Sequence, residues 1–133
     1  MKLVVDTNVL IAYFWKNSET RKIIASEKDL ELMAPEFALE EINKYKKEII
    51  KKAKISEEDF KISRIDLAIS IKFFKLEAYG NFLKRAFETS PDKNDIDFFA
   101  LALKLNCPLW SNDKKLKEQD KIKVYASHEL IGS

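Results

Sequence analysis

The sequence predicts an α/β fold in which a central, mainly parallel sheet carries helices on both faces. Two observations support this prediction. Short apolar runs with the composition of strands alternate along the chain with longer amphipathic stretches. The first run, residues 3–5, leads at once into Asp6, Thr7 and Asn8, which is typical of a buried strand that delivers polar groups at its carboxyl end.

Composition indicates one ordered domain covering residues 1–133. The chain has 133 residues, is 46% hydrophobic, and contains only two glycines and three prolines. No apolar run approaches the length of a membrane span and the first residues do not have a signal-peptide layout, so we expect a soluble, cytoplasmic protein without membrane contacts. A net charge of +2 is too mild to indicate nucleic-acid binding by itself.

Cysteine and histidine content limits the chemistry. The single cysteine, Cys107, excludes an internal disulfide, and the single histidine, His128, gives no support to histidine-based catalytic or metal sites. Any metal ligands should therefore be mostly oxygen atoms.

The first half of the chain should contain two strands and four helices. Asp6 or Thr7 can cap the first helix, Asn17-Ser18 the second, and Ser56 the fourth, because each precedes an apolar or acidic first turn. Pro35 suits the first position of the third helix. The expected elements are a strand at 3–5, helices at 9–14 and 20–25, a strand at 31–34, and helices from 35 to about 52 and from 57 to 67.

The second half should contain three short strands and three helices. Ser90-Pro91 separates a helix near 79–88 from the most apolar helix of the chain, 95–105. Asp97 and Lys104 share one edge of that helix and should form a solvated stripe. The remaining elements are strands at 70–74, 108–110 and 121–125, and a last helical turn from 127.

Four carboxylates occupy inward or strand-end positions. Asp6 and Asp113 each follow a short apolar strand, Asp95 projects toward the buried side of its helix, and Glu41 borders the apolar stripe of its own. Taken one at a time, capping or surface roles explain these acids as well as chemistry does. Taken together without basic partners, they would need raised pKa values or a divalent cation. Mg²⁺ or Mn²⁺ suits such oxygen ligands and can promote phosphodiester cleavage.

With these residues in place, the chain resembles the PIN domain, the nuclease fold of the VapBC toxins and of several RNA-processing factors. The resemblance lies in LVVDTNVL, APEFALEEI, PDKNDIDFFALALKLN and CPLWSND, in the order that the family has them. It implies a three-layer α/β/α sandwich, dependence on Mg²⁺ or Mn²⁺, and hydrolysis of single-stranded or structured RNA. In about residues 50–80 we identify no motif of the family.

The resemblance also implies roles for particular residues. The acidic positions of the family fall on Asp6, Glu41, Asp95 and Asp113, and its supporting polar positions fall on Asn8 and Ser111. Asp92 could assist the metal site or simply cap the following helix. Many members carry a further acid after the last aspartate, where this chain has Lys114-Lys115, so the resemblance does not extend to a complete second metal site.

The leading hypothesis is a hydrolase, a metal-dependent endoribonuclease that acts as the toxin of a toxin–antitoxin pair, with a small antitoxin as partner and a homodimer implied by the family. The alternative is a PIN-like module that binds RNA or protein without cleavage. A haloacid dehalogenase-type phosphatase is disfavoured because Asn8 stands where that class has a second aspartate.

Contacts to RNA have two sets of candidates. Lys114, Lys115 and Lys117 beside Asp113 could hold phosphates, whereas the lysines between residues 44 and 54 are better explained as a solvated helix face. The aromatic run Tyr13-Phe14-Trp15 could stack on bases, but a place in the core or in a dimer contact is the simpler explanation.

Overall fold

The computed structural model describes residues 1–27 and 29–131, with the exception of the Asp95 side chain. Within these residues, five parallel strands form one sheet in the order β3-β2-β1-β4-β5. The strands are β1 Lys2–Val5, β2 Glu31–Pro35, β3 Ile71–Phe74, β4 Leu109–Trp110 and β5 Val124–Tyr125. The predicted parallel α/β fold is therefore confirmed.

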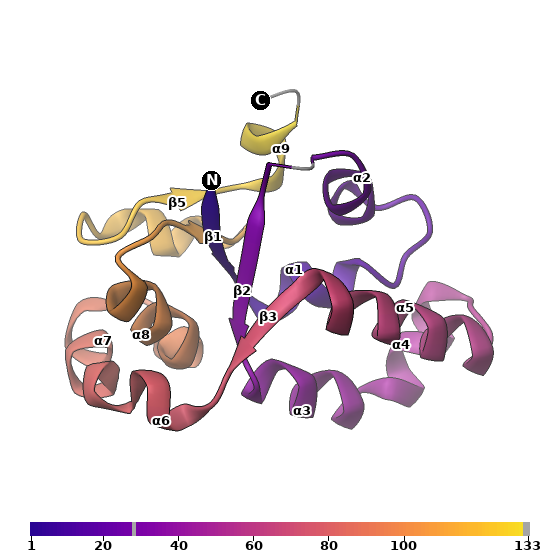
Figure 1. The fold of residues 1–133 in the computed structure, drawn as a ribbon, viewed down its shortest axis with the longest axis horizontal. Helices are drawn as coiled ribbons and strands as arrows, with labels where there is room; N and C mark the ends of the chain where they lie inside the picture. The colour runs from indigo at the N-terminus through magenta and orange to yellow at the C-terminus, as the bar shows by residue number, and fades with distance from the viewer. Residues whose placement is uncertain (28, 132–133) are drawn as a thin grey trace.

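Helices cover both faces of the sheet, which gives three layers (Figure 1). The group α6, α7 and α8 lies on one face, and the group α1, α3, α4 and α5 lies on the other. The helices are α1 Thr7–Ala12, α2 Glu19–Ser26, α3 Phe37–Lys44, α4 Lys46–Ala53, α5 Glu57–Ser70, α6 Leu76–Tyr79, α7 Leu83–Thr89, α8 Ile96–Leu105 and α9 Ser127–Leu130, with 3₁₀ turns at Gly80–Phe82, Lys93–Asp95 and Lys114–Glu118.

The predicted helix caps are present. The Ser18 hydroxyl accepts the N–H of Arg21 at 3.1 Å, and Ser56 forms a reciprocal capping box with Asp59. Left-handed residues close two helices, Lys54 after α4 and Asn106 after α8. Local sequence therefore fixes where several of these helices begin and end.

Two predicted features of the third helix are wrong. Pro35 ends β2 in register with Phe74 instead of starting a helix. Proline has no N–H to donate to a neighbouring strand. The strand tolerates Pro35 because the next hydrogen bond to β3 is donated by the N–H of Glu36 to the Phe74 carbonyl at 2.8 Å. The single helix expected from 35 to 52 is broken at Tyr45 into α3, which packs on α1, and α4, which packs on α5.

The apolar helix α8 packs across the sheet, and its residues 98–102 are all buried. The prediction that Asp97 belongs to a solvated stripe is wrong. Its Oδ2 accepts a 2.5 Å hydrogen bond from the phenol of buried Tyr79. Burial and the Asp97 carboxylate both raise the pKa of Tyr79. This bond ties α8 to α6. None of the helices in the described chain has the length and apolar character needed to cross a bilayer.

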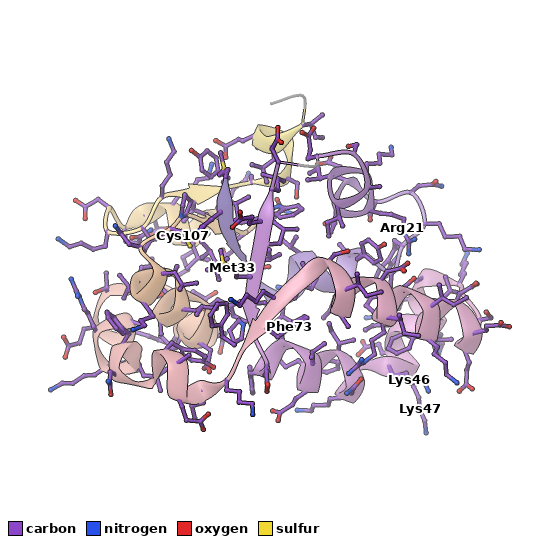
Figure 2. All side chains as sticks on the ribbon, in the orientation of Figure 1. Arg21, Met33, Lys46, Lys47, Phe73 and Cys107 are labelled. Atoms are coloured by element: carbon purple, nitrogen blue, oxygen red, sulfur yellow. The ribbon has the colours of Figure 1, made fainter. Side chains whose placement is uncertain are left out.

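Arg21 joins three segments on the α1 side of the sheet (Figure 2). Its Nε donates to the Tyr13 carbonyl at 3.0 Å, and its Nη2 donates to the Ser63 hydroxyl on α5 at 2.8 Å. The guanidinium also lies over the Tyr13 ring, 4.3 Å from the centroid. Because α1 starts at the strand end that carries Asp6, this contact holds the segment that follows the candidate site.

Replacing Arg21 with alanine should lower the free energy of unfolding by about 1–3 kcal/mol, because the buried Ser63 hydroxyl loses its partner. Urea denaturation measures the change. The exposed neighbour Lys22 provides the control, since Lys22→Ala should shift stability by less than about 0.5 kcal/mol. Equal effects of the two substitutions would contradict the role assigned to Arg21.

Candidate active site

Asp6 lies where β1 passes into α1. Its N–H donates to the carbonyl of Trp110 on β4 at 3.1 Å, and its Oδ1 accepts the N–H of Val9 at 2.9 Å as the cap of α1. Only 2% of the residue is exposed. The carboxylate is thus fixed by the sheet on one side and by a helix N-terminus on the other, as the capping interpretation predicted.

Ser111 connects Asp6 to Asp113. The pairing of Val5 with Trp110 places Ser111 just past the end of β4, beside Asp6, to which its side chain is hydrogen-bonded. The same buried hydroxyl accepts the N–H of Asp113 at 3.1 Å. Asp113 in turn caps the 3₁₀ turn Lys114–Glu118 by accepting the N–H of Lys115 at 3.0 Å.

Asp92 brings a third carboxyl group to this place. It caps the turn Lys93–Asp95 by accepting the N–H of Asn94 at 2.9 Å, and its carboxyl group also forms a hydrogen bond with the carboxyl group of Asp113. Sequence reasoning gave Asp92 mainly a capping role. No local pattern revealed its contact with Asp113, because the two residues meet only through the fold. We call Asp6, Asp92 and Asp113 the acid cluster.

Glu41 reaches the site through Thr7. From α3, its Oε1 accepts a hydrogen bond from the hydroxyl of Thr7 at 3.2 Å, and Thr7 directly follows Asp6 in the chain. Sequence reasoning considered Thr7 only as a possible cap. A hydroxyl that holds a carboxylate of another helix is a supporting contact that the Asp-Thr-Asn segment alone could not reveal.

Other predicted residues lie around the cluster. Asn8 contributes its backbone N–H to Asp6 while its side chain is exposed. Lys114 and Lys117 line a hollow of about 450 Å³ together with Asp113, and Lys117 is also ion-paired with Glu129. Lys115 lies close enough to lower the pKa of Asp113. The predicted ligand Asp95 ends the turn that Asp92 caps, and its side chain lies outside the described part of the structure.

Electrostatics disfavours full ionisation of the acid cluster. The pKa of Asp6 is raised from 3.8 to about 6, mainly by burial and in part by the charge of Asp113, while hydrogen bonds to Ser111 and Val9 act in the opposite direction. The contact with Asp92 raises the pKa of Asp113. Within the described residues, neither Asp6, Glu41 nor Asp113 forms an ion pair with a lysine or arginine.

These groups have the chemistry of a hard-cation site. A divalent cation bound to oxygen ligands would compensate carboxylates that lie close together. Among the side chains that the structure describes, no three Asp, Glu, His or Cys residues converge closely enough to hold a metal ion by themselves. The described acids alone therefore do not make a complete metal site, and a cation bound there would need water molecules or a further protein ligand.

The fold and the site define an α/β protein whose carboxylates gather at the carboxyl ends of its central parallel strands. The sequence model of the PIN domain matches residues 4–125, and the chain belongs to this family. PIN domains are generally nucleases, and the family generally uses divalent metal ions. The resemblance inferred from the sequence is confirmed.

A solved structure shares the fold. A chain in the crystal structure of VapBC2 from Rickettsia felis bound to a DNA fragment from their promoter superposes with a TM-score of 0.63 at 16% identity. The match covers 95% of this chain and 98% of the other. At this level of identity the likeness establishes the fold alone. The comparison with curated proteins returns no match.

The buried carboxyl of Asp6 makes stability depend on pH in the presence of a chelator. Its pKa is about 6 in the folded chain against an ordinary 3.8, so its contribution to stability is complete below pH 3.8 and is lost as pH rises through 6. The loss amounts to about 3 kcal/mol. Urea denaturation between pH 4 and 7 should show this fall in the native chain and not in Asp6→Asn, which keeps the capping oxygen.

The exposed Asp120 gives a control, because Asp120→Asn should retain the fall in stability. If the unfolding free energies of the native chain and Asp6→Asn run parallel between pH 4 and 7, the raised pKa of Asp6 is refuted.

Proposed function

We propose that this PIN domain is an endoribonuclease that requires Mg²⁺ or Mn²⁺ and acts as the toxin of a toxin–antitoxin pair. The observation that carries the proposal is the acid cluster, in which the buried Asp6, the half-buried Asp113 and Asp92 are held at the ends of neighbouring parallel strands and the adjoining turn. Ligand sites of open α/β sheets are found at this edge.

Different residues of the site would bind the cation and the phosphates. Asp6, Asp92 and Asp113 would hold the cation from the sheet side and Glu41 from α3, while Asp95 joins them on sequence grounds alone. A bound divalent ion supplies an activated water and stabilises the charge that develops on the phosphate. Ser111 orients the Asp6 carboxylate and holds the backbone N–H of Asp113, and Thr7 orients Glu41. Lys114 and Lys117 line the hollow beside Asp113, where their charges would attract phosphates.

Two observations support a protein partner, namely the structural neighbour and the exposed surface of α5. The neighbour belongs to a VapBC2 assembly on promoter DNA, which supports a small antitoxin as partner. Ile62, Ile65 and Ile69 share one side of α5 and are 52%, 51% and 79% exposed. Such a stripe is suited to a protein contact, either with an antitoxin or with a second copy in a homodimer. A cytoplasmic location, where RNA is available, is part of the same proposal.

A second candidate is a PIN domain that binds RNA or protein without cleaving it. One observation favours this candidate, namely that the described acids alone do not form a set of three converging ligands. The two candidates differ in whether RNA is hydrolysed when metal is supplied.

Cleavage of a labelled pool of single-stranded and hairpin RNAs tests the proposal. The native chain should cleave with Mg²⁺ or Mn²⁺ and not with chelator. Asp6→Asn, Asp113→Asn and Glu41→Gln should each reduce the rate by about 100-fold, because each removes a carboxylate that faces the metal. Gel analysis of initial rates gives the comparison.

Glu40→Gln is the matched control for Glu41→Gln. Glu40 adjoins Glu41 on the same helix but lines a separate hollow with Asp97 and Tyr79, so its loss should leave the rate unchanged. RNA binding without hydrolysis under either metal would favour the second candidate. Equal losses in the Glu40 and Glu41 variants would remove Glu41 from the site.

Thr7→Val tests the supporting contact. Without the hydroxyl, the Glu41 carboxylate is no longer held at 3.2 Å, and Mn²⁺ affinity measured by calorimetry should fall by about 10-fold. Thr89→Val on α7, across the sheet, should bind Mn²⁺ like the native chain. Unchanged affinity in Thr7→Val would mean that Glu41 does not need this contact.

A further inference from the structure

A hollow of about 360 Å³ begins beside Thr7 and Glu41 at the active site and continues between residues of α1 and residues of α3 and α4. We call it the aromatic groove. One wall contains Thr7, Ile11 and Trp15, and the other contains Glu41, Tyr45, Glu48 and Lys52.

The spacing of these residues explains the direction of the groove. Thr7, Ile11 and Trp15 recur every four residues along α1 and the turn that follows it, so they lie on one side. Glu41 on α3 and Tyr45, which follows α3, are also four residues apart. Lys52 lies on α4 and lines the same hollow. The hydrogen bond between Thr7 and Glu41 closes the inner end beside Asp6. Eight residues at helical rise span about 12 Å, so the groove extends well beyond the acids.

Only one residue of the aromatic run is placed to line this groove. Phe14 is fully buried and stacked on Phe60 with ring centroids 4.7 Å apart. Tyr13 is 8% exposed and lies under the guanidinium of Arg21. Trp15 is half-buried and lines the groove together with Tyr45, which is 38% exposed.

Charges of both signs lie along the groove, since Glu41, Glu48 and Lys52 line it and Lys44 lies over the ring of Tyr45. The Lys44 ammonium is 5.5 Å from the centroid of the Tyr45 ring, and Lys52 lies on the groove in a 2.7 Å ion pair with Glu48. Both lysines are exposed. Aromatic rings interleaved with lysines are typical of surfaces that bind single-stranded nucleic acid, since bases stack on the rings while ammonium groups follow the phosphates.

We propose that the aromatic groove binds an unpaired nucleobase of the RNA, stacked on Trp15 and Tyr45 and adjacent to the phosphodiester at the acid cluster. The proposal rests on RNA being the substrate, as argued above. Continuity with the active site favours a base over a side chain of a partner protein, because an occupant of the groove would lie beside the phosphate to be cleaved. A stacked base is separated from its complement, so the site selects single-stranded over duplex RNA.

Binding can be measured without cleavage, by adding a chelator and a 12-nucleotide RNA, single-stranded or annealed to its complement. The chain has two tryptophans, and Trp110 is fully buried and bonded to Ser127. Quenching of tryptophan fluorescence by RNA therefore reports on Trp15. We expect quenching by the single strand and little by the duplex.

Substitutions test which rings take part. Trp15→Leu should abolish the quenching, and Trp15→Leu and Tyr45→Leu should each weaken single-strand binding by about 10-fold, measured by fluorescence anisotropy. Phe37→Leu is the control, since Phe37 is an exposed ring that lines a different hollow, and its loss should leave binding unchanged. Thermal unfolding confirms that each variant is folded, and the exposed position of Tyr45 makes its variant the safer of the two.

The outcomes separate this proposal from the proposed nuclease. Equal binding of single strand and duplex, or native affinity in both leucine variants, would overturn the base site. The same holds if Trp15 responds to a partner protein and not to RNA. If the native chain binds as expected but cleaves no RNA with Mg²⁺ or Mn²⁺, the base site stands and the nuclease fails. If it cleaves and both variants keep the native kcat/KM, the nuclease stands and the base site fails.

Discussion

Burial of the Asp6 carboxylate is the constraint on which the site depends. A carboxylate with 2% exposure is costly unless its oxygens are satisfied, and here the N–H of Val9 and the side chain of Ser111 supply the partners. These partners come from the start of α1 and the end of β4, so the charge is satisfied only when the strands are correctly paired. Burial of this one acid lowers the stability of the fold, and the same contacts fix the geometry of the site.

Parallel strand order explains how segments distant in sequence meet. β1 lies between β2 and β4, so the strand that ends at Asp6 has the strand leading to α3 on one side and the strand leading to Ser111 on the other. The capping turn at Asp92 then brings its carboxyl group against Asp113. Asp6, Asp92 and Asp113 each also cap a helix or turn, so the same side chains serve both local folding and the site.

Sequence patterns predicted the parts of this structure that depend on local chemistry. The strands, the caps at Ser18 and Ser56, and the strand-end positions of Asp6 and Asp113 follow from residue type and period. The break at Tyr45 and the strand position of Pro35 were missed because packing of α4 on α5 and pairing with Phe74 override helical preference. The contacts of Thr7 with Glu41 and of Asp92 with Asp113 join separate segments, so no local pattern could have indicated them.

Thr7 belongs to both the active site and the aromatic groove, since its hydroxyl holds Glu41 while its side chain lines the hollow. Two ligands that share one wall are thermodynamically linked. An occupant of the groove that tightens or loosens the Thr7–Glu41 contact would change the affinity for the metal by some factor. The bound metal would then change the affinity for that occupant by the same factor. With a cation and a base bound as proposed, this one hydroxyl group would link the binding of the cation to what lies in the neighbouring groove.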